Sequence, residues 1–292
     1  MRLRGGAKRG ARLVWNGLNL HFASVICVCV ALLTFSARAD EVARPDFGWR
    51  QAWTGADVHS NGWLMYAGAT VAPYTDIYSD GLRLRATTGY GGYGWEGRYV
   101  KPANGDPVND RFKGYATTGY ADLLVGYYKQ IGPATVKAFI GAAMIEHHLG
   151  TIKCANANCD SEDTISELVH GTDWGPKASF EIWLNIGANA FASFDASFTT
   201  AHDTSSSHAR LGYRILPTVS VGLEAAVNTN ARNNFFSQKE PDHRAPDYRG
   251  GVFVRYEWFT GEIAVSGGFT TGDAGNISEN AIYGTLNYAT HF

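Results

Sequence analysis

Histidine and serine side chains that could support lipid or acyl-group hydrolysis gather in one polar segment of the chain. It runs from His202 through Asp203, Thr204 and three consecutive serines to His208. Nucleophilic catalysis needs a serine hydroxyl bonded to a histidine that a third group orients. Loop sequence does not establish this geometry, and no Gly-x-Ser-x-Gly turn occurs. Two interpretations of this segment therefore remain: a solvated loop, which is the commoner case, and the rim of a hydrolase active site. Further candidate histidines are His147, His148 and His170.

Two cysteines, Cys154 and Cys159, lie close together in another polar stretch. In an oxidising compartment such a pair is expected to form a disulfide, which restricts the loop. A zinc site is the more specific alternative, but the two cysteines supply only two of the four ligands that structural zinc requires. Asp160, Glu162 and Asp163 follow, without a recognisable calcium-binding spacing. We therefore expect a disulfide, and no metal or other cofactor.

The first 39 residues have the pattern of a cleaved secretory signal peptide. Basic residues precede an apolar run from Ala23 to Phe35 and the small-residue site Ala37-Arg38-Ala39. The apolar run is too short to span a bilayer, which takes about 20 residues. We expect a signal peptide at residues 1–39 and one domain at residues 40–292. That domain carries 19 basic and 27 acidic residues, so nucleic acid is a poor partner for it.

Apolar and polar residues alternate with a period of two along most of the domain, which predicts β-strands. Val219, Val221 and Leu223 share one face of such a segment, while Ser220 and Glu224 share the other. Each segment thus has one apolar face that is compatible with lipid and one polar face that is compatible with water. About twelve strands are expected, an even number as in bacterial single-chain barrels. They are residues 48–59, 62–72, 81–98, 113–129, 134–149, 173–185, 188–201, 207–216, 218–230, 248–259, 261–271 and 279–292.

The connections between these strands alternate between short and long, as the turns and external loops of outer-membrane barrels do. The short ones are residues 130–133, 186–187, 216–217 and 260–261, and the long ones are residues 100–112, 150–172, 202–206, 230–247 and 270–278. Residues 73–80 and 60–61 break the rule. A secreted β-sandwich would explain the alternation of residues but not that of the loops. The prediction is an all-β, antiparallel up-and-down outer-membrane β-barrel.

The last expected strand carries Tyr288 and Phe292 on its apolar face. A terminal aromatic residue on a final amphipathic strand resembles the assembly signal of bacterial outer-membrane barrels. The expected location is thus the outer membrane of a Gram-negative bacterium. The expected contacts there are outer-membrane lipid and the outer-membrane assembly machinery.

The faces opposite to lipid should line the barrel interior, and charges of both signs fall on them. Because charges cannot remain unpaired in a dry interior, they need partners or water. Most are interpreted as a structural ladder of ion pairs, with a polar conduit or binding site as the functional alternative. The lumen-lining candidates are Arg83, Arg85, Glu181, Asp195, Arg210, Arg214, Glu224, Arg255 and Glu257, and Lys137, Glu146 and Glu262 are assigned to the same faces.

Several glycine-rich motifs carry a family resemblance. They are Thr54-Gly55-Ala56-Asp57, Tyr66-Ala67-Gly68-Ala69, the run from Asp80 to Arg85, Gly89-Tyr90-Gly91-Gly92-Tyr93 and the later Leu123-Leu124-Val125-Gly126-Tyr127. In these the chain resembles the bacterial cellulose biosynthesis protein BcsS family over most of the domain. The loop from Cys154 to Cys159 has no counterpart in the family pattern. The resemblance implies an accessory protein of cellulose production, with no catalytic residues to carry over, beside a separate inner-membrane synthase.

The resulting hypothesis is a non-enzymatic barrel that helps cellulose cross, emerge from or stay attached to the cell surface. Cellulose or another glucan is then the expected ligand, and other cellulose-synthesis proteins are candidate partners. A barrel of this size filled by charged side chains is narrow for a glucan, so attachment competes with conduction. An outer-membrane hydrolase or acyl-modifying enzyme and a general small-solute porin are the alternatives.

Overall fold

The computed structural model describes residues 48–103, 106–150, 153–154, 170–229, 247–273 and 278–292. The chain divides into compact units at residues 1–40 and 41–292, and every described residue belongs to the second unit. The expected signal peptide and Cys159 lie outside the described residues. The disulfide therefore stays a prediction.

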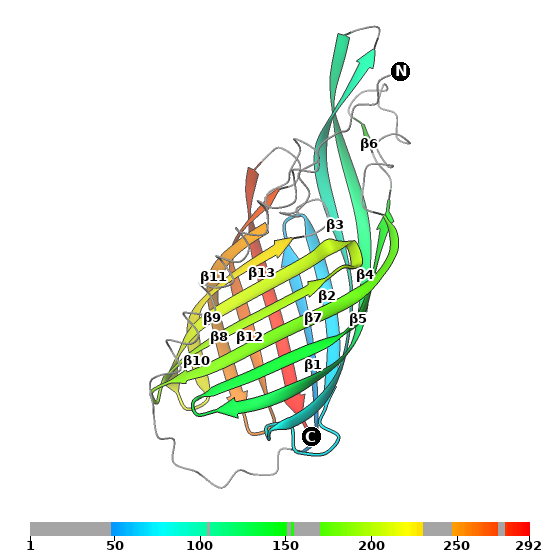
Figure 1. The fold of residues 1–292 in the computed structure, drawn as a ribbon. Helices are drawn as coiled ribbons and strands as arrows, with labels where there is room; N and C mark the ends of the chain where they lie inside the picture. The colour runs from blue at the N-terminus through cyan, green and yellow to red at the C-terminus, as the bar shows by residue number, and fades with distance from the viewer. Residues whose placement is uncertain (1–47, 104–105, 151–152, 155–169, 230–246, 274–277) are drawn as a thin grey trace, which may run out of the picture. The chain divides into compact units, whose positions relative to one another are not determined.

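Within the described residues, twelve antiparallel strands form a closed ring (Figure 1). Each strand pairs with the next along the chain, and the last pairs with the first. The ring strands are β1 (Arg50–His59), β2 (Gly62–Val71), β3 (Gly81–Ala103), β4 (Asp106–Ile131), β5 (Ala134–Leu149), β7 (Gly171–Ile186), β8 (Ala190–Thr199), β9 (Thr204–Leu216), β10 (Val219–Thr229), β11 (Asp247–Trp258), β12 (Gly261–Asp273) and β13 (Ser278–His291). The two-residue β6 (Lys153–Cys154) pairs with β4 outside the ring. The predicted up-and-down barrel is confirmed.

Two predicted loops are wrong. Residues 100–103 and 106–112 belong to a hairpin, in which β3 and β4 pair continuously as far as Ala103 and Asp106. The sequence between them is Asn104-Gly105, the pair most favoured in two-residue hairpin turns, and this signal was missed. Residues 202–206 are mostly strand as well. Only the short 3₁₀ turn η1 (Ala201–Asp203) separates β8 from β9.

The outer face of the ring is apolar. Leu223 is 62% exposed, Val252 60% and Ile282 70%, and the outward residues of the neighbouring strands are similar. A soluble protein rarely exposes so continuous an apolar surface, and a sandwich would bury it. The barrel is therefore built to face lipid. No helix in the described part of the chain is long and apolar enough to span a membrane.

The short turns after β4, β7, β9 and β11 lie at one end of the ring, and Phe292 lies with them (Figure 1). The two-residue β1–β2 turn and the η1 connection lie at the other end. In outer-membrane barrels the short turns face the periplasm. We call the end with Phe292 the short-turn end, and the other the long-connection end. At the short-turn end the backbones of Arg50 and Phe292 exchange hydrogen bonds of 2.9 and 3.1 Å.

Aromatic rings on the inner face lie across glycines of the adjacent strand. The cross-strand pairs are Trp53 with Gly68, Tyr66 with Gly55, Tyr120 with Gly89, Phe139 with Gly126, Phe191 with Gly212 and Phe253 with Gly222. A Cβ atom built on any of these glycines would lie within 3 Å of the partner's ring. The glycines thus let large rings lie close to the wall of a narrow barrel.

Replacing Gly212 by valine should destabilise the barrel by about 1–3 kcal/mol, because the added carbons overlap the fully buried ring of Phe191. The midpoint of the heat-induced mobility shift of the membrane-folded protein on gels measures this. Gly250→Ala is the matched control, since nothing lies within 4 Å of a Cβ atom at Gly250. Equal midpoints for the two variants would contradict this account of the aromatic–glycine pairs.

Candidate functional site

The interior of the barrel contains a cavity of about 1040 Å³. Strands from all sides of the ring contribute to its wall. Of the charged side chains described there, seven are carboxylates and five are basic. They are Asp57, Asp122, Glu181, Asp195, Glu224, Asp247 and Glu262, with Arg85, Lys137, Lys177, Arg210 and Arg249. This cavity is the candidate functional site.

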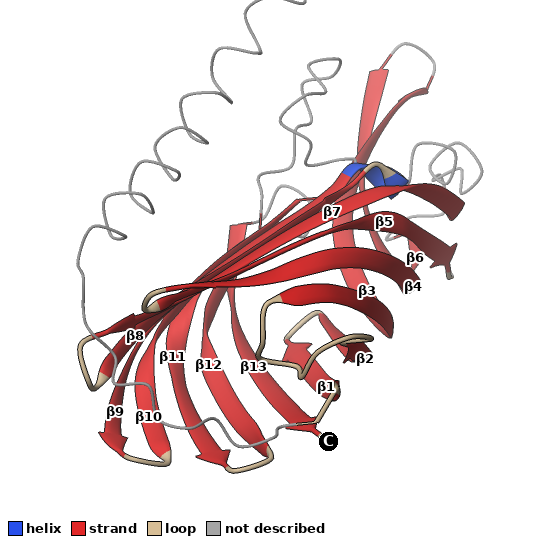
Figure 2. Cartoon of the chain, turned by 60° about the horizontal axis from the view of Figure 1, so that its bottom comes forward, coloured by secondary structure: helices blue, strands red, loops and turns tan. Residues whose placement is uncertain are grey.

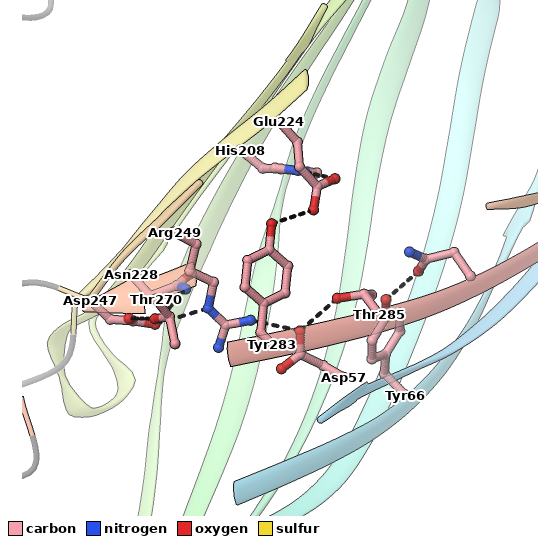
Figure 3. A network of polar contacts seen from close by, with 11 residues as sticks. Asp57, Tyr66, His208, Glu224, Asn228, Asp247, Arg249, Thr270, Tyr283 and Thr285 are labelled. Atoms are coloured by element: carbon pink, nitrogen blue, oxygen red, sulfur yellow. Dashed lines mark hydrogen bonds and ion pairs between the residues drawn. The ribbon is translucent and has the colours of Figure 1, made fainter. Parts of the chain in front are cut away.

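One network in the cavity wall is centred on Arg249 of β11 (Figure 3). Its guanidinium donates to Asp57 of β1 over 2.6 Å and to Asp247 over 3.0 Å. Thr285 also donates to Asp57, over 2.9 Å, and Thr270 donates to Asp247. The arginine thus joins strands that are not neighbours in the ring.

A second network converges on Glu224 of β10 (Figure 3). The Tyr283 hydroxyl donates to one carboxylate oxygen over 2.8 Å, and Arg210 donates to the other over 3.1 Å. His208 Nε2 lies 3.3 Å from the same second oxygen. Glu224 is therefore fully engaged with the wall rather than available to a ligand.

Across the cavity, Glu181 of β7 binds two cations. Lys137 Nζ lies 3.0 Å from one carboxylate oxygen, and Arg85 of β3 donates to the other. Beside them, Lys177 Nζ lies 2.6 Å from Asp122 Oδ2. These ion pairs connect β3, β4, β5 and β7 on this side of the cavity, as the Arg249 network connects β1 and β11 on the other side.

Asp195 and Tyr120 present polar atoms to this side of the cavity that have no partner among the described residues. Asp195 is the cross-strand neighbour of Glu181, and its carboxylate makes no hydrogen bond or ion pair with the described residues. The Tyr120 hydroxyl, which also lines the cavity, has no hydrogen-bond partner in the described part of the chain. Both groups can bond to a ligand or to water. Asp122 Oδ1 also lacks a hydrogen-bond partner among the described residues, but this atom is buried and does not reach the cavity surface.

Toward the short-turn end the lumen is filled by aromatic rings and arginines. Trp183 stacks on Phe191 with ring centroids 4.4 Å apart, and Phe253 lies 6.2 Å from Phe191. The guanidinium of Arg255 lies 4.7 Å from the Trp183 ring, and that of Arg214 lies 5.2 Å from Phe191. Phe191 and Phe253 point inward yet are only 0% and 2% exposed. We call this set of five residues the aromatic floor.

The connection between β2 and β3 folds against this end of the barrel, as Figure 2 shows from below. Arg83, 1% exposed, donates to the carbonyls of Asp76 and Ile77 over 3.1 Å each. The Tyr78 hydroxyl lies 3.3 Å from His291 Nδ1 of β13. Burial raises the pKa of Tyr78 to about 12, with nearby Glu262 adding to the effect. Residues 73–80, which were expected to be only a longer link, therefore form a structured cover together with Ala72.

The cover is also stabilised from within by Asp76. Burial works against the charged form of this carboxyl. Hydrogen bonds from the Ser79 hydroxyl and the Tyr78 amide outweigh that cost, so the pKa of Asp76 lies below its usual value. The carboxylate therefore holds the turn closed at neutral pH.

The structure places the sequence-predicted lumen residues in two groups. Those that line the cavity are Arg85, Glu181, Asp195, Arg210 and Glu224, together with Lys137 and Glu262. Those at the short-turn end are Arg83, Arg214, Arg255 and Glu257. The assignment of Glu146 to the lumen is wrong, because Ile145 and His147 on either side of it line the cavity while Glu146 is exposed beside His148.

Sequence analysis missed Asp57, Asp247 and Arg249, the centre of the first network. Asp247 was assigned to a loop, and Arg249 was not assigned to the inner face of its strand. Arg249 lies on the same face of β11 as Phe253 and Arg255. Extending the alternation of that strand back from Phe253 to Arg249 would therefore have found it.

The rim histidines and serines do not assemble a nucleophile. His147 lies 3.1 Å from the Tyr93 hydroxyl, and its ring centroid lies 5.0 Å from that of His202. His208 is bound to Glu224, and Ser206 is paired with Ser197. Among the described residues, none of the hydrogen bonds of these three histidines goes to a serine. His170 makes further contacts of its own.

The fold and cavity define the class of protein: a transmembrane β-barrel of the outer-membrane type with a polar interior. Within that class, the model of the cellulose biosynthesis protein BcsS family matches residues 51–292, and the chain belongs to this family. The resemblance noted in the glycine-rich motifs is thereby confirmed. No curated protein matches the chain.

Solved barrels share the general fold at low identity. A TodX deltaS2S3 mutant monoaromatic hydrocarbon channel is 11% identical, with a TM-score of 0.48, over 90% of this chain and 94% of that one. The transport unit of the Escherichia coli autotransporter AIDA-I is 10% identical, with a TM-score of 0.46, over 92% and 98%. The KdgM porin in complex with disordered oligogalacturonate is 8% identical, with a TM-score of 0.43, over 83% and 99%. These likenesses add nothing on function.

Replacing Arg249 by methionine should lower the free energy of unfolding by about 3 kcal/mol, because Asp57 and Asp247 would remain as uncompensated carboxylates. Urea denaturation of the barrel in detergent measures this. The double variant Arg249→Met, Asp57→Asn should recover part of the loss. Lys129→Gln is the control, since its pair with Asp80 is exposed and should contribute little. A stability of Arg249→Met equal to that of the control would refute the role of the network.

Proposed function

We propose that this protein is a non-enzymatic outer-membrane accessory protein of bacterial cellulose biosynthesis that assists export or surface attachment of the polymer. The family match over residues 51–292 carries the proposal, because it covers the lipid-facing barrel and its cavity together. The apolar outer face supports a location in the outer membrane. The polar cavity supports contact with a polyhydroxylated chain.

A strain lacking the gene should retain the glucan synthase activity of its inner membranes but lose cellulose at the cell surface. Acid-insoluble glucose in washed cells measures the loss. Complementation with the intact chain should restore it, and complementation with the poorly folding Gly212→Val variant should restore less. Normal surface cellulose in the deletion strain, combined with steady ion conductance of the purified barrel, would instead favour a small-solute porin.

The alternative of a hydrolase or acyl-modifying enzyme makes a separate prediction. Changing His202 and His208 to alanine should leave cellulose output unchanged, because neither histidine makes a hydrogen bond to a serine hydroxyl of the described residues. The heat-modifiable mobility of each variant must first show normal barrel assembly, since His208 also contacts Glu224. Loss of output from variants that fold normally would favour the enzymatic function.

A further inference from the structure

We infer that the barrel is a one-ended vestibule that holds a short stretch of neutral glucan chain, and that it does not pass the polymer through. The inference rests on the proposed function and deepens it, because it separates attachment from conduction. It follows from three properties of the interior: a closed short-turn end, an open cavity toward the other end, and paired cations in the cavity wall.

The short-turn end is closed by contacts that cross the lumen. In a wide pore the inward side chains of distant strands would not touch. Here Arg255 of β11 lies over Trp183 of β7, with three strands between them in the ring. The same guanidinium lies 5.6 Å from the Phe191 ring of β8. Rings and guanidinium groups thus extend across the bore between β7, β8 and β11.

The β2–β3 cover completes this closure where the cavity reaches lowest. The cavity descends to Gln51 and Glu262, on the β1 and β12 side of the ring. Tyr78 lies on that same side, bonded to His291 and close enough to Glu262 for its titration to respond to that charge. The buried Ile77 and Arg83 fix the backbone of the cover. The cover thus closes the β1 and β12 side of the short-turn end, beside the aromatic floor.

Toward the long-connection end the cavity follows the strands to their ends. Asn61 of the β1–β2 turn, Tyr93 of β3, His147 and Leu149 of β5, and Thr229 of β10 all line it. These residues come from widely separated positions around the ring. A ligand therefore enters from the side that faces away from the periplasm.

The charges of the wall favour a neutral ligand. Each of the five cations that line the cavity is already paired with a carboxylate. An anionic ligand would have to break these pairs, which is costly in a partly buried site. Acceptors, in contrast, are in excess: seven carboxylates face five cations in the cavity wall, and the carboxylate oxygens of Asp195 have no hydrogen-bond partner in the described part of the chain. A chain of sugar hydroxyls supplies the donors that these oxygens lack.

The size and lining of the cavity fit a few sugar units. Its volume of about 1040 Å³ lies at the top of the usual range of about 300–1,000 Å³ for ligand sites. Tyr66, Tyr120 and Trp53 lie against the wall across their glycines and present ring surface that can stack on sugar rings. The Ser197–Ser206 pair adds hydroxyls opposite them. A glucan chain end seated there would be retained at the surface.

The test uses the full mature barrel in detergent, with cellohexaose as the neutral probe and a hexameric oligogalacturonate as the anionic one. Titration calorimetry should show binding of cellohexaose in preference to the anion. Asp195→Asn and Tyr120→Phe should each weaken binding about tenfold, the loss of one hydrogen bond involving a charged or buried group. Glu146→Gln is the control, since Glu146 lies beside His148 outside the cavity. In planar bilayers the wild-type barrel should give no steady conductance.

The outcomes separate this inference from the proposed function. Steady conductance of the wild-type barrel, preference for the anion, or equal affinity of Asp195→Asn and Glu146→Gln would each overturn the vestibule. Each of these results leaves the proposed function standing if the deletion strain still lacks surface cellulose. Normal surface cellulose in the deletion strain overturns the proposed function, whatever the barrel binds. Replacing Phe191 and Phe253 by alanine, with assembly verified, should create conductance by opening the aromatic floor.

Discussion

The pairing of β1 with β13 is the constraint on which the rest of the structure depends. A strand in lipid cannot leave its backbone donors and acceptors unpaired, so the sheet has to close. Closure in the observed register sets Gln51 against His291 and His59 against Tyr283. The same register places Asp57 beside Thr285, which makes the Arg249 network possible. One choice of hydrogen-bond partners thus decides which side chains meet inside the barrel.

Closure at twelve strands also makes the interior small enough that opposite walls touch. The buried charges then have to find partners, and they do so across the bore as well as along it. Glycines opposite the inward rings supply the room that this packing needs, at the same residues that carry the family resemblance: Gly55 with Tyr66, and Gly68 with Trp53. The glycine-rich motifs are therefore explained by the width of the barrel, and require no glycan contact of their own.

Much of the fold could be predicted because alternation with a period of two is a local signal. The strands β10, β11 and β12 were placed within one or two residues of their observed bounds. The pairs that cross the lumen could not be predicted, since whether Arg249 meets Asp57 depends on ring order and strand stagger. The structure of the β2–β3 cover could not be predicted either, because it depends on hydrogen bonds from Arg83 to backbone carbonyls of the connection. The strands of the barrel wall could thus be predicted locally, whereas the packing inside the lumen depends on tertiary structure.

The β3–β4 hairpin fixes the depth at which the barrel sits in the bilayer. Beyond Tyr93 and Tyr115 these two strands pair mainly with each other in the described part of the chain, apart from the short contact with β6. At about 3.3 Å per residue, the remaining ten residues of β3 extend about 30 Å further. Among the described residues, most amides and carbonyls on their outer edges have no backbone partner, and lipid cannot supply one. The hydrocarbon boundary therefore runs no higher than Tyr93 and Tyr115, and the hairpin stands entirely in the aqueous layer outside it.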